Sequence, residues 1–339
     1  MKNRQIVFTK VNTAELLPCE MPVIGDHDVM VKIEVSTISS GTERANITGE
    51  VNIDIYSRSA VPVFPRYGGY SSAGVVLQVG KKVENLHEGD RVALSWSRHC
   101  RYIGIKASNV YKIEDSRITF QEAALTHIAI FPLAAIRKCR LEIGEPAMVM
   151  GLGILGMIAV KELRAAGACP IIAVDTAEEK RKAALMHGAD YAFDPMDESF
   201  PKKVIEASRG GIKVAIEATG LGTALNTALD CMARFGRVAL LGCTRNSDFT
   251  VDYYRKVHGP GISLIGAHTI ARPEHESSPG MWTQRDDAMT VLSLLAADRL
   301  SLIDLIEETH KPKEAPEVYK RLAESKAFPV TQFDWSGME

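Results

Sequence analysis

The run Gly151-Leu152-Gly153-Ile154-Leu155-Gly156 has the G-x-G-x-x-G spacing that can cradle a pyrophosphate. It follows an apolar stretch, 147–150, that predicts a strand, and it precedes a helical pattern that continues to about residue 166. In that setting the first glycine allows a tight turn, the second lets phosphate approach the backbone, and the third lets the helix pack on the strand. The helix amino terminus then faces the phosphate charge, so we predict a dinucleotide site here.

Asp175 ends the next predicted strand, about twenty residues beyond the last glycine, where a carboxylate binds ribose hydroxyls. A carboxylate repels a ribose phosphate, and Thr176 rather than Arg follows it, so the pattern favours NAD over NADP. Lys180 is predicted to flank the adenosine, and a solvated helix face is the alternative for it. The alternative for the motif is a glycine-rich turn with Asp175 as a helix cap. The predicted cofactor contacts of this region are Gly151, Gly153, Ile154, Leu155, Gly156, Asp175, Thr176 and Lys180.

The composition is that of an ordinary globular protein of about two domains, with 339 residues, 46% apolar and 24% charged. It excludes a disordered, collagen-like or disulfide-stapled chain. The chain has 40 Lys and Arg residues and 42 Asp and Glu residues, so it has neither the excess of basic residues that binds nucleic acid nor a polybasic tail for a membrane. The start of the chain turns polar at once, and no run of about 18 apolar residues occurs. We therefore expect a cytoplasmic protein with neither a nucleic-acid nor a membrane partner.

The six cysteines show neither C-x-x-C spacing nor a Cys/His cluster. This spacing predicts free thiols in a reducing compartment and argues against a metal site.

Two patterns of predicted secondary structure follow one another along the chain. Up to about residue 115 it reads as short strands between Gly and Pro turns, at 29–35, 74–80, 90–96 and 110–113, which predicts a small barrel-like β domain. From residue 119 helices alternate with strands, which predicts a doubly wound parallel sheet. The helices are expected at 121–139, 154–166, 176–187, 223–234, 286–297 and 316–326, and the strands at 147–150, 171–174, 214–217, 237–241 and 263–266. Thr176 and Glu179 form a predicted capping box.

Several further segments carry a family pattern: Ile38-Ser39-Ser40-Gly41-Thr42-Glu43, Gly69-Tyr70-Ser71-Ser72-Ala73-Gly74, Gly89-Asp90-Arg91-Val92 and Glu217-Ala218-Thr219-Gly220. With the glycine turn and Asp175, they make the whole chain resemble the medium-chain dehydrogenase/reductase superfamily of alcohol and polyol dehydrogenases. The resemblance implies an α/β fold with a GroES-like β-barrel catalytic domain and a Rossmann domain. It also implies that the tail returns to the first domain, with bounds of 1–118 plus 273–339 and of 119–272.

The zinc-dependent members of that superfamily bind the metal through a Cys in a G-I-C-G-T-D-like segment, a His in G-H-E-x-x-G, and a later Glu or Cys. Here these positions fall on Ser39 or Ser40, depending on a one-residue gap, on Tyr70 and on His127. Hydroxyls are poor zinc ligands and one His cannot hold a catalytic zinc, so we predict no metal. The four-cysteine structural lobe is also missing. The chain is therefore similar to a branch without either zinc site, which includes the bacteriochlorophyllide hydroxyethyl dehydrogenases.

Hydride transfer from an alcohol requires a hydride acceptor, a proton acceptor and a group that stabilises alkoxide character. NAD supplies the first. His127 is the leading candidate for the general base, because an ordinary imidazole titrates near neutrality; a packed histidine is the alternative. Thr42 falls where the family places a proton-relay hydroxyl, Glu43 could orient His127 or bind a substrate hydroxyl, and the Tyr70 phenol could donate to an alkoxide. The alternatives are a turn-capping hydroxyl for Thr42 and a cap or surface role for Glu43.

Three further cofactor contacts follow strand ends, where ligands of open α/β sheets collect: Thr219, Cys243 and His268. By resemblance they approach the nicotinamide. Ser40, His99 and Trp282 are the candidate substrate contacts, although a surface position is the alternative for His99 and a core position for Trp282.

The chain is thus predicted to be an NAD-dependent, zinc-independent dehydrogenase of a secondary alcohol on a sugar, cyclitol or polyol. The alternatives are a zinc-free NADPH quinone or enone reductase and a non-catalytic dinucleotide-binding protein. The family resemblance also implies a homodimer joined through Rossmann-domain edge strands, with 261–265 as the candidate edge; an internal strand is the alternative for that run.

Overall fold

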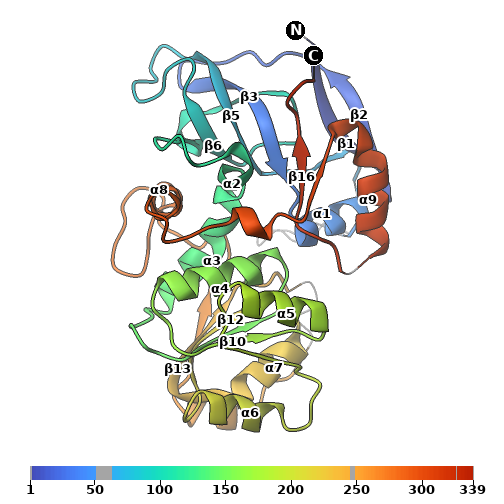
Figure 1. Cartoon of the computed structure of the whole chain (residues 1–339). Coiled ribbons are helices and arrows are strands. Elements are labelled where there is room, and N and C mark those ends of the chain that lie inside the picture. The colour runs from blue at the N-terminus through green and yellow to red at the C-terminus, as the bar shows by residue number, and fades with distance from the viewer. Residues whose placement is uncertain (1, 51–62, 245–248, 326, 339) are drawn as a thin grey trace. The chain divides into compact units, whose positions relative to one another are not determined.

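The computed structural model describes residues 2–50, 63–244, 249–325 and 327–338. The chain divides into two compact units, unit 1 with Met1–Ile128 and Ala288–Glu339, and unit 2 with Ala129–Asp287 (Figure 1). The two divisions fall inside helices, in α3 (Thr126–Lys138) and in α8 (Gln284–Ala296). Both lie further along the chain than the predicted bounds after residues 118 and 272.

Unit 1 is built on two sheets. The three-stranded sheet has the order β2-β1-β4, with β1 (Asn3–Lys10), β2 (Thr13–Cys19) and β4 (Arg66–Tyr67). The seven-stranded sheet has the order β15-β16-β3-β5-β6-β8, with β7 paired to β3. Its strands are β3 (Asp28–Thr37), β5 (Ser71–Val79), β6 (Arg91–Ser95), β7 (Tyr102–Lys106), β8 (Val110–Lys112), β15 (Glu308–His310) and β16 (Thr331–Asp334). The four predicted strands correspond to β3, β5, β6 and β8.

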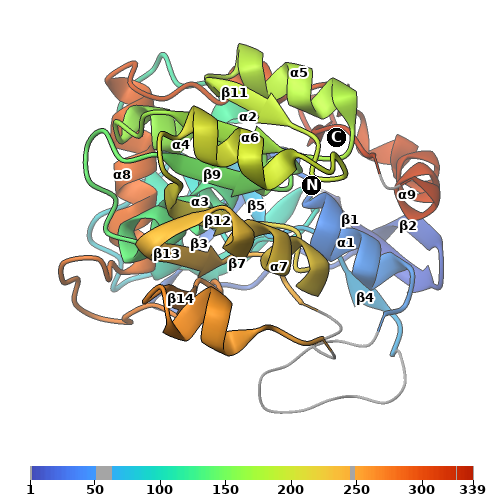
Figure 2. The ribbon, with the colours of Figure 1, turned by 90° about the horizontal axis from the view of Figure 1, so that it is seen from below.

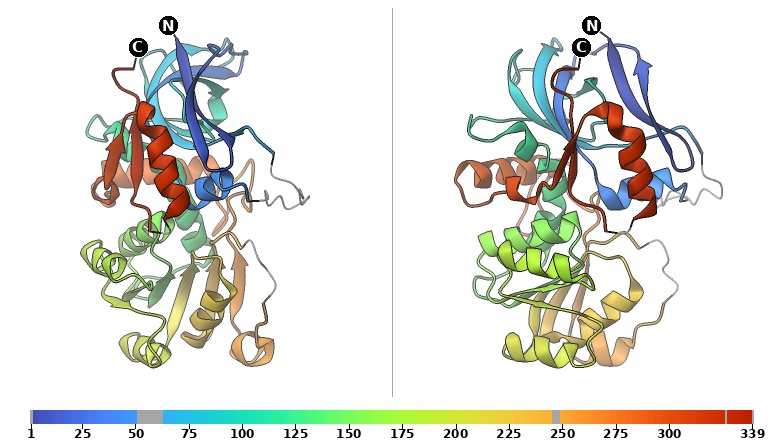
Figure 3. Two further views of the ribbon diagram at one scale, coloured as in Figure 1. Left: turned by 90° about the vertical axis from the view of Figure 1, so that its right-hand side faces the viewer. Right: turned by 45° about the vertical axis from the view of Figure 1, so that its right-hand side comes forward.

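The core of unit 1 forms because β3 alternates buried apolar residues with partly exposed ones, so that Val29, Val31 and Ile33 face inward. The tail completes this core. Strand β16 pairs antiparallel with β3, α9 (Ala315–Glu324) packs against β2, and the Tyr319 ring of α9 lies 4.8 Å from that of Phe8 on β1. Figure 3 shows β16 and α9 in red beside the blue N-terminal strands. Chain segments far apart in sequence therefore share one core.

Unit 2 contains a six-stranded parallel sheet in the order β11-β10-β9-β12-β13-β14. The strands are β9 (Ala147–Met150), β10 (Ile171–Val174), β11 (Tyr191–Phe193), β12 (Ile212–Glu217), β13 (Met232–Leu240) and β14 (Ser263–Gly266). The helices are α4 (Ile154–Ala165), α5 (Glu178–Met186), α6 (Phe200–Ala207) and α7 (Gly222–Asp230). Figure 1 shows α4 and α5 over one face and α6 and α7 over the other, which buries the central strands on both sides. Figure 2 shows β14 at the outer side of β13. The predicted doubly wound sheet is confirmed.

The single helix predicted over 121–139 is wrong. The structure has α2 (Phe120–Ala123) and α3, separated at Ala124 and Leu125. The carbonyl of Ala124 accepts hydrogen bonds from the hydroxyls of Thr37 and Ser71, at 2.9 and 2.7 Å. These sheet hydroxyls occupy a carbonyl that a continuous helix would use, so the helix is interrupted there.

Two other local predictions are corrected. The helix expected to run to residue 234 ends at Asp230, because Met232 already pairs with Ile212 as the start of β13. The capping box at Thr176 does not form, because Ala177 is the N-cap residue of α5 and its amide donates to the carboxylate of Asp175 at 2.9 Å. Lys326, the last residue of the predicted tail helix, lies outside the described residues.

Candidate functional site

The turn between β9 and α4 uses its three glycines in three different ways. Gly151 has φ of +94°, and a Cβ there would lie 2.6 Å from the Thr219 side chain. A Cβ on Gly156 would lie 1.9 Å from the Gly151 carbonyl oxygen, so only glycine lets α4 start this close to the strand. A Cβ on Gly153, the exposed N-cap residue of α4, would meet nothing within 4 Å. The turn therefore leaves open backbone at a helix amino terminus, as a pyrophosphate requires.

The Asp175 carboxylate is tied to this turn. Its Oδ2 accepts a hydrogen bond from the Leu152 amide at 2.8 Å, and its Oδ1 accepts one from the Ala177 amide. Lys180 Nζ lies 3.9 Å from Oδ2. Each carboxylate oxygen can accept more than one hydrogen bond, so capacity remains for ribose hydroxyls. Asp175 thus ties the glycine turn to the segment before α5 without capping that helix, whose N-cap residue is Ala177, and it keeps the chemistry for the cofactor role, while Thr176 is exposed.

Thr219, Cys243 and His268 follow β12, β13 and β14, which are neighbours in the sheet. Cys243 and His268 are exposed and Thr219 is partly buried. A Cβ on Gly220 would lie 2.6 Å from the Cys243 carbonyl oxygen, so the first two loops touch. Burial lowers the pKa of His268, and the Lys138 ammonium lowers it further, so the imidazole favours its neutral form. Neighbouring strand ends therefore present a row of loops that begins at the glycine turn.

Glu217 anchors the loop after β12, a role for which the sequence analysis did not single it out, naming it only within a motif. It is 3% exposed at the end of β12, and its Oε1 accepts from the Thr219 amide at 2.7 Å. The Thr219 hydroxyl also donates to Oε1, and the Gly220 amide lies 3.1 Å from Oε2. Burial raises the pKa of Glu217, while these hydrogen bonds lower it. An acidic residue ending an apolar strand was the available signal for this anchor.

Unit 1 brings three hydroxyl groups together. The Tyr70 phenol donates to Ser39 Oγ, and it is also hydrogen-bonded with the Thr42 side chain. Burial raises the pKa of Tyr70 to about 12, so the phenol keeps its proton at neutral pH. Thr42 is exposed on α1 (Ser40–Ile47). Of the two serines left open by the sequence, Ser39 contacts Tyr70 and Ser40 begins the helix.

His127 lies on α3 with its ring against two aromatic side chains. The ring centroids of His127 and Tyr70 are 5.3 Å apart, and those of His127 and Trp96 are 4.6 Å apart, both in edge geometry. His127 is 1% exposed and Trp96 is 43% exposed. The structure therefore places Ser39 and His127 on the same Tyr70 side chain, and these are the three positions that the family resemblance predicts to correspond to zinc ligands. Trp96 was missed, because nothing in its local sequence points to this contact.

This donor set does not fit zinc. One imidazole, one serine hydroxyl and one protonated phenol offer a single good zinc ligand, whereas catalytic zinc takes three protein ligands. In the described part of the chain, no group of three or more His, Cys, Asp or Glu residues could hold a metal ion. Each of the six cysteines is described and is a free thiol.

Glu43 and His99 require a correction, because both lie in a buried network. Glu43 is 1% exposed; its Oε1 accepts from the Ser39 amide at 2.8 Å, and its Oε2 accepts from His99 Nε2 at 3.0 Å and from the Tyr319 hydroxyl. His99 is fully buried, with Nδ1 at 2.7 Å from Ser36 Oγ. Glu43 therefore holds Ser39 in place instead of orienting His127, and His99 is neither on the surface nor open to a substrate.

Glycines explain how this network fits. A Cβ on Gly68 would lie 2.8 Å from Glu43 Oε2, and one on Gly69 would lie 2.7 Å from the His99 amide nitrogen. Gly69 also has φ of +84°. The Trp282 ring lies under the Arg137 guanidinium, whose Cζ is 3.5 Å from the ring centroid, and its contact with a substrate stays a prediction.

Two family models match the chain. The alcohol dehydrogenase GroES-like domain matches residues 25–119, and the zinc-binding dehydrogenase model matches residues 155–282. Among relatives, sorbitol dehydrogenase of Bombyx mori is 25% identical over 71% of this chain and 77% of the relative. D-guloside 3-dehydrogenase of Escherichia coli is 23% identical over 93% of this chain and 95% of the relative. No described helix is long and apolar enough to cross a membrane.

Solved structures share the fold over 98% of this chain and 99% of each match. Galactitol-1-phosphate dehydrogenase from Escherichia coli has a TM-score of 0.84 at 20% identity. A putative zinc-binding dehydrogenase from Sinorhizobium meliloti, bound to NADP, has a TM-score of 0.81 at 17% identity. An alcohol dehydrogenase from Escherichia coli, complexed with NADH, has a TM-score of 0.82 at 16% identity.

Proposed function

Because the chain belongs to the medium-chain dehydrogenase/reductase superfamily, we propose that it transfers a hydride between a secondary alcohol and NAD without zinc. The chain is an oxidoreductase of the alcohol and polyol dehydrogenase kind that acts with a nicotinamide cofactor on a small-molecule alcohol. The proposal adds the choice of NAD over NADP, the absence of zinc, and a sugar, cyclitol or polyol as the substrate. The free cysteines favour a reducing compartment, for which we propose the cytoplasm.

The observation that carries the zinc-free proposal is the meeting of Ser39, Tyr70 and His127. A zinc ion would otherwise polarise the alcohol oxygen at such a place. The Tyr70 phenol has one proton, so once the substrate oxygen replaces Ser39 Oγ as its acceptor, it can donate to the oxygen on which negative charge develops. The buried Glu43 supports this arrangement through the Ser39 amide. The substrate then keeps its oxygen oriented by hydroxyl donors of the chain.

Proton and hydride must leave the alcohol by different routes. Bound NAD supplies the hydride acceptor for the carbinol carbon. The hydroxyl proton passes to His127, our proposed general base, and the exposed Thr42 hydroxyl is the proposed relay to water. In the reverse direction the same groups return a proton to the carbonyl oxygen.

The choice of NAD rests on Asp175, whose carboxylate would repel a ribose phosphate. Lys180 at 3.9 Å weakens that repulsion, and this contact is the observation that favours the alternative NADPH-dependent reductase. The proposed pyrophosphate contact is the backbone of the Gly151–Gly156 turn.

We also propose a homodimer through β14. This strand forms the edge of its sheet, and Leu264 on it is 41% exposed. An exposed apolar edge strand carries backbone groups that pair readily with a second chain.

The function is tested with purified protein, NAD⁺ or NADP⁺, and a panel of sugars, cyclitols and polyols, by following absorbance of the reduced nicotinamide. We expect turnover with NAD⁺, unchanged by a chelator. Asp175→Asn removes the charge and should shift the ratio of NADP⁺ to NAD⁺ affinity towards NADP⁺ by about tenfold, because hydrogen bonds to a charged group are worth about 1.5–3 kcal/mol.

Three results would contradict the proposal. One tightly bound zinc per chain would refute the metal-free site. Turnover only of quinones or enones with NADPH would establish the reductase alternative. NADH binding with no turnover of any substrate would indicate a non-catalytic dinucleotide-binding protein.

A further inference from the structure

The segment 266–272, which we call the β14 loop, comprises the last residue of the edge strand of unit 2 and the six residues after it. It includes the exposed His268 and Ile270, the latter 51% exposed. Its own backbone bonds are few: the Ala271 amide donates to the His268 carbonyl at 2.9 Å, and the Ala267 amide donates to Leu240 at 3.1 Å. A short exposed loop of this kind is ordinarily solvated and mobile.

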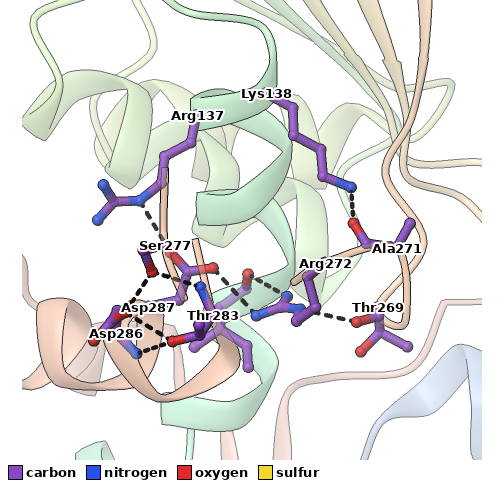
Figure 4. A network of polar contacts seen from close by, with 10 residues as sticks. Arg137, Lys138, Thr269, Ala271, Arg272, Ser277, Thr283, Asp286 and Asp287 are labelled. Atoms are coloured by element: carbon purple, nitrogen blue, oxygen red, sulfur yellow. Dashed lines mark hydrogen bonds and ion pairs between the residues drawn. The ribbon is translucent and has the colours of Figure 1, made fainter. Parts of the chain in front are cut away.

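Lys138 joins the two ends of this loop. The side chain projects from the last residue of α3, and its Nζ donates to the Gly266 carbonyl at 3.0 Å and to the Ala271 carbonyl. Figure 4 shows the contact with Ala271. Burial lowers the pKa of Lys138, and the neighbouring Arg272 lowers it further. The charged ammonium therefore loses favourable contact with water at this position.

Arg272 fixes the middle and the end of the loop. Its Nε donates to the Thr269 carbonyl at 2.9 Å, and its Nη2 donates to the Ile130 carbonyl at 3.3 Å. Its Nη1 lies 3.1 Å from Oδ2 of Asp287, a fully buried carboxylate. Asp287 Oδ1 in turn lies 3.0 Å from Arg137 Nε, as Figure 4 shows. The β14 loop is therefore attached to α3 and to the start of α8 by charged side chains.

The start of α8 is itself anchored. The Asp286 carboxylate accepts from the hydroxyls of Ser277 and Thr283, the latter at 2.8 Å, and the Ser277 hydroxyl accepts from the Thr283 amide at 2.9 Å (Figure 4). These hydrogen bonds hold the start of α8, and Asp287 with it, in place. Because Arg272 contacts Asp287, the β14 loop is attached to this fixed position.

The position of the loop indicates which half of the dinucleotide it would contact. The glycine turn, Thr219, Cys243 and His268 follow β9, β12, β13 and β14, which lie in that order across the sheet. Asp175 follows β10, on the other side of β9. Ligands of parallel sheets lie along the carboxyl ends of such strands. With the adenosine at Asp175, the β14 loop is the part of the row furthest from it and faces the nicotinamide end.

We propose that Lys138 and Arg272 are positioning residues that hold the β14 loop in the shape that receives the nicotinamide half of the dinucleotide. This inference rests on the dinucleotide binding proposed above and adds two residues that need not touch the cofactor. A preformed loop loses little conformational freedom on binding, which is how rigid sites gain affinity. Loosening the clamp should therefore weaken ligands that carry nicotinamide and spare ligands that lack it.

The test compares NADH with ADP-ribose, which lacks the nicotinamide, by titration calorimetry. Lys138→Met removes both donors and keeps an apolar stem of similar length. We expect NADH to bind about tenfold more weakly and ADP-ribose to stay within about twofold of wild type, because one charge-assisted hydrogen bond corresponds to about a factor of ten or more. Lys138→Arg retains donors and should restore most of the NADH affinity.

Lys213→Met is the matched control. Lys213 also donates to a backbone carbonyl, that of Arg234 at 2.9 Å, but it lies at the amino end of β12. It should change neither affinity. If Lys138→Met does not fold, Arg272→Lys tests the other half of the clamp with the charge retained.

Amide hydrogen exchange of the ligand-free protein gives a second readout. Lys138→Met should speed exchange at Ala267 and Ala271 and leave β9 unchanged. Equal weakening of NADH and ADP-ribose, or no weakening of either, overturns the inference. Wild-type protein that binds neither ligand refutes the proposed dinucleotide site itself, so the two failures are distinguishable.

Discussion

The sequence resemblance predicts that Tyr70 stands where zinc-dependent members of the superfamily carry a histidine, and its surroundings favour a hydrogen-bond donor over a metal ligand. Loss of solvent raises its pKa most, hydrogen bonds with Ser39 and Thr42 lower it, and the Glu43 charge raises it. The balance leaves a phenol with a pKa of about 12. A phenol of this kind stays protonated near neutral pH and can therefore donate a hydrogen bond.

Tyr70→Phe should therefore reduce kcat by about a hundredfold, the lower range for loss of one donor to a developing oxyanion, and change KM little. The pH profile of the wild type should show no inflection from Tyr70 between about pH 6 and 9, because its pKa lies well above that range. Both are measured from steady-state rates with the substrate found in the panel.

Tyr102→Phe is the control, a buried tyrosine on β7 in the same unit. It should keep full activity. Full activity in Tyr70→Phe would remove the phenol from the mechanism.

At the scale of residues, the sequence identified candidate side chains but not the residues that they contact. Motif spacing was enough to single out Tyr70 and His127. The partners of Glu43 were not predictable, because Tyr319 comes from the tail and Gly68 must lack a side chain for the network to close. The burial of His99, which was predicted to contact substrate or lie on the surface, was missed for the same reason: it depends on segments that are distant in the sequence.

Among the elements, the parallel strands of unit 2 were predictable because both of their faces are buried, which produces continuous apolar runs. The ends of the helices were less predictable from the sequence. The break before α3 depends on hydroxyls of Thr37 and Ser71, and the end of α7 depends on the pairing of Met232 with β12. Neither signal lies within the helix concerned.

At the scale of elements, the testable prediction concerns the edge strand β14. Leu264→Lys would place like charges opposite each other across the proposed dimer axis, where they repel. We expect the mass measured by analytical ultracentrifugation to fall from dimer to monomer. Leu185→Lys, at a 46% exposed leucine on α5, should leave the mass unchanged. A wild-type monomer, or a Leu264→Lys dimer, would contradict the proposed interface.

For the molecule as a whole, the near-neutral net charge of −2 conceals charge buried inside unit 2. Glu162 on α4 is 2% exposed and Asp287 is fully buried. Burial raises the pKa of Asp287 to about 6 in spite of Arg272 and Arg137. Burial also raises the pKa of Glu162 well above its usual value, and the Asp287 charge raises it further while Arg137 lowers it. Composition shows the number of such charges but not their burial.

These raised pKa values fix the sign of a pH effect on stability. Between the ordinary carboxyl pKa and the raised one, the folded state holds more protons than the unfolded state, so the free energy of unfolding falls as pH rises. The contribution is complete below about pH 4 and is lost as the pH passes through the raised values, about 6 for Asp287.

Glu162→Gln isolates one of the two groups while keeping the side-chain shape. Its free energy of unfolding should fall less steeply than that of wild type above about pH 4.5, by up to about 1.4 kcal/mol per pH unit, which is the limit for one proton. The variant should therefore be the more stable protein at neutral pH. Urea unfolding followed by circular dichroism at a series of pH values measures the difference. Glu179→Gln, the same change on the exposed side of α5, should follow the wild type throughout. If the Glu162→Gln curve instead ran parallel to wild type, the buried carboxyl would not be taking up the proton.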